Sequence, residues 1–86
     1  MYWVYVLRSE KRKELYIGYT SNLQNRIAEH QRGESTSTKR YLPWELVYVE
    51  GYSSRNDALT REKNLKYFAK AYIQLKRRLK NSLADR

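Results

Sequence analysis

Five polar side chains in this sequence have the chemistry that hydrolysis of a phosphodiester bond needs: Tyr5, Tyr16, Arg26, His30 and Glu62. A single carboxylate is enough for one Mg²⁺ ion, which takes its other ligands from water and substrate phosphate. An arginine offsets the charge that develops in the transition state, and a tyrosine or histidine relays the proton of an attacking water. The sequence has no Ser-His-Asp constellation, no glycine-rich phosphate loop and no second carboxylate placed beside Glu62. This set favours phosphodiester hydrolysis over acyl transfer.

Two of these residues share a short amphipathic helix. Leu23 and Ile27 form its apolar stripe, and at 100° per residue Arg26 and His30 lie at the border of that stripe, one turn apart. There the guanidinium and the imidazole could meet one phosphate. The alternative is an arginine whose stem covers the edge of the core beside a half-buried, hydrogen-bonded histidine.

Glu62 lies on the apolar face of a second helix, with Ala58, Leu65 and Ala69. A carboxylate on such a face is normally paired or bound to a metal. An ion pair with Lys66, four residues on, would ordinarily lie further from the apolar face than Glu62 does, so the pattern favours a metal ligand. The alternative is an ion pair with one of the neighbouring cations Lys66, Arg61 or Arg55.

The composition indicates a nucleic-acid partner. The chain has 86 residues, which predicts one domain over 1–86, and its net charge of +9 is the electrostatic pattern of a nucleic-acid binder. Acidic lipid and a merely solvated basic surface are the alternatives. The absence of cysteine fits a reducing cytosol, and no apolar run resembles a signal peptide or a membrane span, so we expect a cytoplasmic protein with no membrane partner.

The periodicity predicts one small α/β fold with α+β layers. Apolar runs indicate strands over residues 2–7, 15–19 and 44–50. Helices are expected over 20–33, with Ser21 or Asn22 as N-cap and Gly33 as the stop, and then over 54–72 and 71–83. The polar segment 34–43 is expected to be a mobile connection. The prediction is therefore a small three-stranded, mainly antiparallel sheet flanked by helices, in the order β-β-α-β-α-α.

Four stretches together resemble the GIY-YIG nuclease domain, in particular its short stand-alone bacterial members. Trp3-Val4-Tyr5 corresponds to the first motif triplet and Tyr16-Ile17-Gly18 to the second. "SNLQNRIAEH" resembles the helix that carries the catalytic arginine, and "ALTREKNLK" the helix that carries the metal ligand. The resemblance covers nearly the whole chain. The first triplet has Trp3 in place of glycine, and the family's late asparagine has no counterpart here.

The resemblance implies a role for each candidate residue. Tyr5 or Tyr16 would position or deprotonate the attacking water, Arg26 would bind the scissile phosphate, and His30 occupies a position that is His or Tyr in the family. Glu62 would hold one Mg²⁺ or Mn²⁺ ion. Two further residues are expected beside the nucleic acid: Gly18, letting the backbone turn close to the substrate, and Tyr19, where the DNA-repair branch has a lysine.

The function expected from the resemblance is a metal-dependent endonuclease acting on DNA, in repair or at unusual DNA structures. The alternative is a catalytically weak nucleic-acid-binding module with the same fold. Exposed cations are expected to contact the DNA backbone, namely Lys39, Arg40, Lys76, Arg77, Arg78 and Lys80. RNA as a substrate, a separate targeting partner and the oligomeric state remain open at this level.

Overall fold

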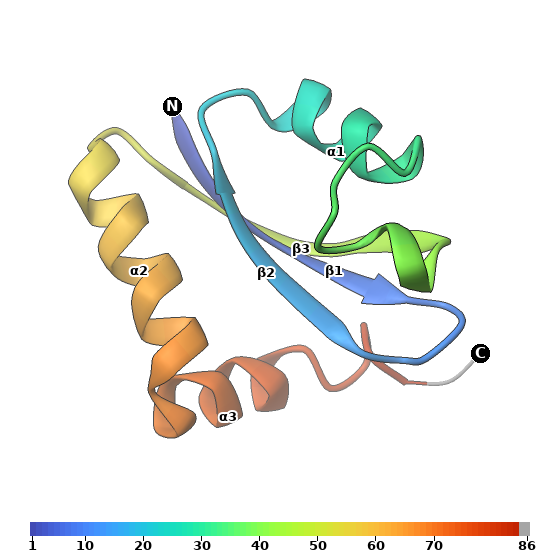
Figure 1. The fold of residues 1–86 in the computed structure, drawn as a ribbon. Coiled ribbons are helices and arrows are strands. Elements are labelled where there is room, and N and C mark those ends of the chain that lie inside the picture. The colour runs from blue at the N-terminus through green and yellow to red at the C-terminus, as the bar shows by residue number, and fades with distance from the viewer. Residues whose placement is uncertain (85–86) are drawn as a thin grey trace.

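A three-stranded antiparallel sheet forms the centre of the fold (Figure 1). The computed structural model describes residues 1–84. The strands are β1 (Tyr2–Ser9), β2 (Leu15–Thr20) and β3 (Trp44–Tyr52), and β1 lies between the other two, antiparallel to both. β2 and β3 are therefore the edge strands of the sheet.

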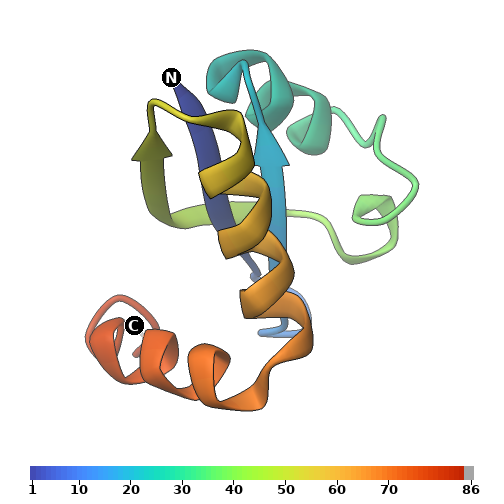
Figure 2. The same cartoon turned by 90° about the vertical axis from the view of Figure 1, so that its left-hand side faces the viewer.

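Three α-helices cover the two faces of the sheet, which confirms the predicted order β-β-α-β-α-α. They are α1 (Leu23–Gln31), α2 (Arg55–Tyr67) and α3 (Ala69–Arg78), and Figure 2 shows α2 lying across the sheet with α3 below it. The side chain of Asn22 caps α1 and that of Ser54 caps α2, each accepting from the backbone N–H three residues on. None of the helices in residues 1–84 is long and apolar enough to cross a membrane.

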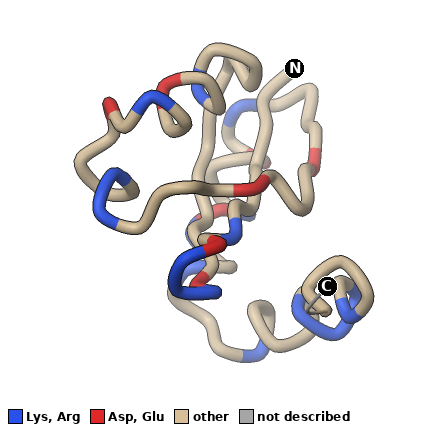
Figure 3. Tube along the Cα trace, turned by 90° about the vertical axis from the view of Figure 1, so that its right-hand side faces the viewer, with Lys and Arg blue, Asp and Glu red and all other residues tan. Residues whose placement is uncertain are grey.

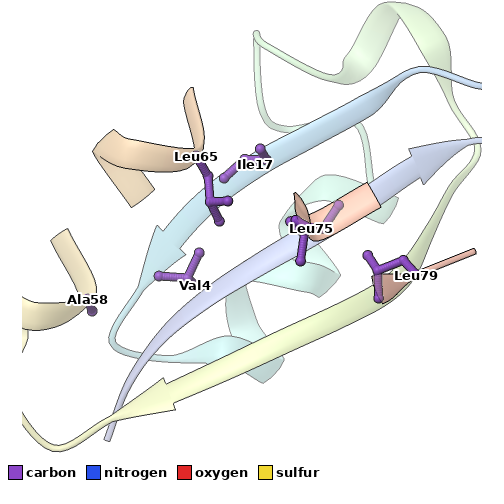
Figure 4. Close-up of a cluster of buried hydrophobic side chains, with 7 residues drawn as sticks. Val4, Ile17, Ala58, Leu65, Leu75 and Leu79 are labelled. Atoms are coloured by element: carbon purple, nitrogen blue, oxygen red, sulfur yellow. The ribbon is translucent and has the colours of Figure 1, made fainter. Parts of the chain in front are cut away.

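Strand alternation divides the core in two. Val4, Val6 and Ile17 face α2 and α3, where they pack with residues shown in Figure 4 (Ala58, Leu65, Leu75 and Leu79). Tyr5, Leu7 and Trp44 face the other way and pack with Tyr16, Leu23 and Ile27. Because successive strand residues point to opposite faces, the two candidate tyrosines lie on the α1 side of the sheet.

The predicted helix over 54–72 is wrong in one respect: it is broken at Phe68. This residue has extended backbone angles (φ −116°, ψ 108°), ends α2 and precedes α3. The break redirects the chain so that Leu75 and Leu79 reach the core under the sheet, which a straight continuation of α2 could not do. α3 ends at Arg78, five residues before the predicted end at 83, and the chain continues in turns.

Segment 34–43 is held against the sheet and does not form the free connection that its polar composition predicts. It contains a 3₁₀ turn, Lys39–Tyr41, and the side chain of Thr38 is fully buried. The indole N–H of Trp44 donates to the Thr38 carbonyl at 2.7 Å, and the Ser9 hydroxyl donates to the Tyr41 carbonyl at 2.6 Å. Buried polar groups need such partners, and here they bring Thr38 next to α1.

A polar cluster ties α2 to β3 and so sets the position of Glu62. The Arg61 guanidinium makes a two-pronged pair with the Glu50 carboxylate, with Nε and Nη2 2.9 and 3.0 Å from its oxygens. Tyr48 and Tyr52 donate their hydroxyls to the same carboxylate. Burial alone would raise the pKa of Glu50, but the bonds from Arg61 and the tyrosines outweigh it and the pKa is lowered.

Candidate active site

A buried chain of hydrogen bonds links β1, α1 and segment 34–43. The Tyr5 hydroxyl lies 2.8 Å from His30 Nε2, and His30 Nδ1 lies 2.7 Å from the Thr38 hydroxyl. Tyr5 is 1% exposed, and His30 and Thr38 are fully buried. Both imidazole nitrogens are thus satisfied, and among residues 1–84 no buried side-chain nitrogen or oxygen lacks a partner.

Burial sets the protonation state of Tyr5 and His30 in this chain of hydrogen bonds. It raises the pKa of Tyr5 to about 12, an effect that the Arg26 guanidinium opposes and the charges of Tyr16 and Glu62 reinforce. Burial also lowers the pKa of His30, and the positive charge of Arg26 lowers it further. At neutral pH both groups are therefore uncharged, which is the state in which one donor and one acceptor can share the Tyr5–His30 bond.

His30 lies deeper than the sequence indicates. The helical pattern placed it at the border of the apolar stripe, whereas in the structure it lies entirely inside, under the rings of Tyr5 and Tyr16, whose centroids are 5.6 and 5.2 Å from its own. Thr38 of segment 34–43, itself fully buried, bonds to His30 Nδ1 and closes off that side of the ring.

Arg26 and Tyr16 are the accessible members of this group. The Arg26 side chain is 31% exposed, and its guanidinium lies 3.6 Å from the Glu29 carboxylate and 3.4 Å from the Ser35 hydroxyl. Tyr16 is half-buried on the edge strand, with its ring centroid 6.3 Å from that of Tyr5. The guanidinium also influences the pKa of the Tyr5 hydroxyl, so that an arginine lies near the buried phenol of Tyr5 and the half-buried phenol of Tyr16.

Glu62 joins the group from α2. This helix packs on both β1 and β2, and its Lys66 ammonium lies 5.9 Å from the centroid of the Tyr16 ring. Glu62 is 20% exposed and forms the intrahelical pair with Lys66 that the sequence argument considered too far out, with 3.2 Å between Oε2 and Nζ. Its charge contributes to the raised pKa of Tyr5, which locates the carboxylate within electrostatic reach of the phenol.

Glu62 is the carboxylate expected to hold a divalent cation, and Glu29 is paired with Arg26. Within the part of the chain that the structure describes, no three His, Asp or Glu side chains gather as metal ligands. Mg²⁺ commonly uses one or two carboxylates and keeps waters and phosphate oxygens as its other ligands. A partly exposed glutamate with hydroxyls nearby fits that donor set, provided that Lys66 gives way or pairs with the substrate instead.

The structure differs from the sequence interpretation at Gly18 and Tyr19. Gly18 lies inside β2, not at a turn, and pairs in register with Tyr5; a Cβ on it would lie 2.4 Å from Tyr5 Cζ and Oη. Its absent side chain makes room for the Tyr5 ring. Tyr19 points to the other face of the sheet, where it packs on the core under α2 and α3, because odd and even strand positions alternate.

The cations expected to contact DNA are exposed but lie in two separate places. Lys39 and Arg40 belong to the 3₁₀ turn beside α1, whereas Lys76, Arg77 and Lys80 belong to α3 and the turn after it. Figure 3 shows the corresponding blue stretches at separate ends of the molecule. A substrate touching both groups would have to extend along the protein.

Sequence analysis missed Thr38 and did not foresee that Lys66 lies over Tyr16. Thr38 stands in a polar run without periodicity, and no local signal distinguishes it from Thr36. Lys66 was considered only as the partner of Glu62. Both residues enter the site through packing between elements distant in sequence.

A comparison with known protein families identifies the class to which this protein belongs. The model of the GIY-YIG catalytic domain matches residues 1–81, and the chain therefore belongs to the GIY-YIG catalytic domain family, a class of nuclease domains. A UPF0213 protein of Natronomonas pharaonis is 41% identical over 71 residues, which is 81% of this chain and 82% of that protein. One from Staphylococcus haemolyticus is 40% identical over 70 residues, or 80% of this chain and 84% of the other.

A solved structure shows the same fold. The solution NMR structure of a UPF0213 protein from Bacillus halodurans matches with a TM-score of 0.58 and 27% identity, covering 93% of this chain and 86% of that one. The short stand-alone relatives predicted from the motifs are thus confirmed. The names of these relatives state no activity.

Proposed function

We propose that this protein is a metal-dependent endonuclease that hydrolyses phosphodiester bonds in DNA. The observation that carries the proposal is the buried Tyr5–His30 pair, whose phenol is influenced by the accessible Arg26, next to Tyr16, over which lies Lys66, the partner of Glu62. Family membership supports the nuclease class, and the net charge of +9 supports a polyanionic substrate.

In this proposal Arg26 binds the scissile phosphate. Its side chain is accessible, and a fixed guanidinium offsets the negative charge that grows on the phosphoryl oxygens in the transition state. Tyr16 is the tyrosine that orients the attacking water, because it is the more exposed of the two.

Tyr5 and His30 act from behind as positioning residues. Neither is exposed enough to contact DNA directly in this conformation. With the His30 proton on Nδ1 toward Thr38, His30 Nε2 accepts a hydrogen bond from the Tyr5 hydroxyl. This bond fixes the phenol oxygen beside Arg26. The Arg26 guanidinium is held at the same time by its pair with the Glu29 carboxylate.

Glu62 would hold the cation, with Mg²⁺ and Mn²⁺ as the expected ions. When bound, such an ion supplies neutralisation of phosphate charge and acidity for a coordinated water. Lys66, released from Glu62, then lies next to Tyr16 and can pair with a phosphate of the substrate.

The test is a nicking assay on supercoiled plasmid and on single-stranded, flapped and branched DNA, with Mg²⁺, Mn²⁺ or EDTA. We expect divalent-ion-dependent cleavage by the wild type and none by Glu62→Gln, while the matched variant Glu10→Gln, at an exposed site in the β1–β2 loop, cleaves normally. Equal cleavage by Glu62→Gln at saturating Mg²⁺ would remove Glu62 from the metal site.

A binding module without useful turnover is the second candidate, and the Glu62–Lys66 pair is the observation that favours it, because it occupies the proposed metal ligand Glu62. In that case salt-sensitive DNA binding persists, but no metal ion elicits cleavage by the wild type or by Lys66→Met, in which the carboxylate is released.

A further inference from the structure

An aromatic groove adjoins the proposed site on its α2 side. It encloses about 450 Å³ between β2 and the α2–α3 junction, a size that suits a small planar ligand. Its lining includes Tyr16, Leu65, Lys66, Tyr67, Phe68 and Tyr72. Tyr16 and Lys66 belong to both the groove and the site, so the two are continuous.

Two of the rings at the groove are exposed without a structural reason within the described chain. Tyr67 is 74% and Phe68 57% exposed, and they occupy the end of α2 and the residue that separates it from α3. Phe68 provides no side-chain cap to α3, and neither ring contributes to the two buried clusters. Large apolar side chains that stay together in water commonly mark a binding surface.

The charge beside these rings favours one kind of ligand. Lys66 stands at the groove with its ammonium over Tyr16, and Lys70 follows as an exposed cation on the first turn of α3. Open rings next to cations are the arrangement that proteins use for single-stranded nucleic acid, where bases stack on the rings and the backbone lies along positive charge. A protein segment or a lipid tail would not need the cations.

We propose that the groove binds an unpaired base of a single-stranded nucleic acid, stacked on Phe68, next to the phosphate held at the site. The inference rests on the proposed function for the location of the scissile bond, but the binding itself does not depend on turnover. A paired base inside a duplex cannot stack on the ring, so the groove selects frayed, flapped or single-stranded regions.

The experiment measures binding in EDTA, by fluorescence anisotropy, of two labelled oligonucleotides of equal length: one with normal bases and one abasic throughout. Phe68→Leu keeps an apolar side chain but removes the ring, and should weaken binding of the normal oligonucleotide about five- to a hundred-fold. Binding of the abasic one should not change. Phe68→Trp should retain or strengthen binding, and Leu46→Ala, an exposed apolar residue on the opposite edge strand, should have no effect.

Three outcomes would refute base binding in the groove. Phe68→Leu could weaken binding of both oligonucleotides equally, it could weaken binding of neither, or the wild type could show no measurable binding to single strands. The proposed function fails separately. If no metal ion elicits cleavage but the base-dependent loss persists, the groove stands and the endonuclease proposal falls. If cleavage occurs and Phe68→Leu binds both oligonucleotides like the wild type, only the groove is refuted.

Discussion

Replacing Gly18 with alanine tests whether this glycine creates the space for Tyr5. The added Cβ would lie 2.4 Å from Tyr5 Cζ and Oη and 2.9 Å from Cε1, well inside van der Waals contact. Because Tyr5 is 1% exposed, the ring cannot move outward freely. To accommodate the methyl group it must shift, and the 2.8 Å bond to His30 Nε2 is broken.

The magnitude follows from three contributions to the free energy of unfolding. Overpacking a core costs about 1–3 kcal/mol, and leaving a buried polar group unpaired costs about 1–3 kcal/mol. The lower entropy of the unfolded alanine chain returns about 0.4–1 kcal/mol. We expect a net loss of about 3 kcal/mol, within a range of about 1 to 5, which in a domain of this size lowers Tm by roughly 10 °C or more.

Thermal unfolding followed by circular dichroism measures this loss, and the nicking assay should show activity falling with it. Gly51→Ala is the matched control: its Cβ would also make close contacts, 2.8 Å from Trp3 and 2.9 Å from Met1. Met1, however, is 64% exposed and Trp3 is only partly buried, so both can yield. A Tm for Gly18→Ala equal to that of Gly51→Ala would refute the account of Gly18.

Three further predictions concern charge. Arg26→Ala should lower turnover by a factor of about 10² or more; a weaker affinity with an unchanged single-turnover rate would make Arg26 a simple phosphate contact. The pKa of His30 is lower in the folded protein than in the unfolded chain, so below about pH 6.5 the unfolded chain binds more protons at this residue. The free energy of unfolding should therefore be highest above that pH and should fall on acidification. Urea unfolding against pH should show this slope, and His30→Gln should flatten it. Charge reversal at Lys76, Arg77 and Lys80 should reduce the slope of log affinity against log salt by nearly one unit per lost phosphate contact. An unchanged slope would place α3 away from DNA.

Local patterns were sufficient for most of the elements. Alternating apolar residues located the strands. Asn22, one of the two candidate caps, caps α1, and Ser54, the first residue of the predicted second helix, caps α2. The two tyrosine triplets, together with the stretches around Arg26 and Glu62, were enough to indicate the family. Such signals work because strand and helix periodicity depend on residues within a few positions of one another.

The arrangement within the site was decided by tertiary packing. The helical pattern placed His30 at the border of the core, but its full burial depends on Thr38 and on the covering segment 34–43. The break at Phe68 likewise depends on packing in the core under the sheet and not on helix propensity.

The sequence alone determined which residue types are available, their order along the chain and the face of each element on which they lie. Only the tertiary structure decided that Lys66 of α2, the partner of Glu62, lies over Tyr16 on the edge strand β2, that Tyr5 is buried while Tyr16 is half-buried, and that Gly18 makes room for the Tyr5 ring. The physical reason is that these neighbours are far apart in sequence. Their distances result from how side chains of different elements fill the same space, and this is not encoded in any local period.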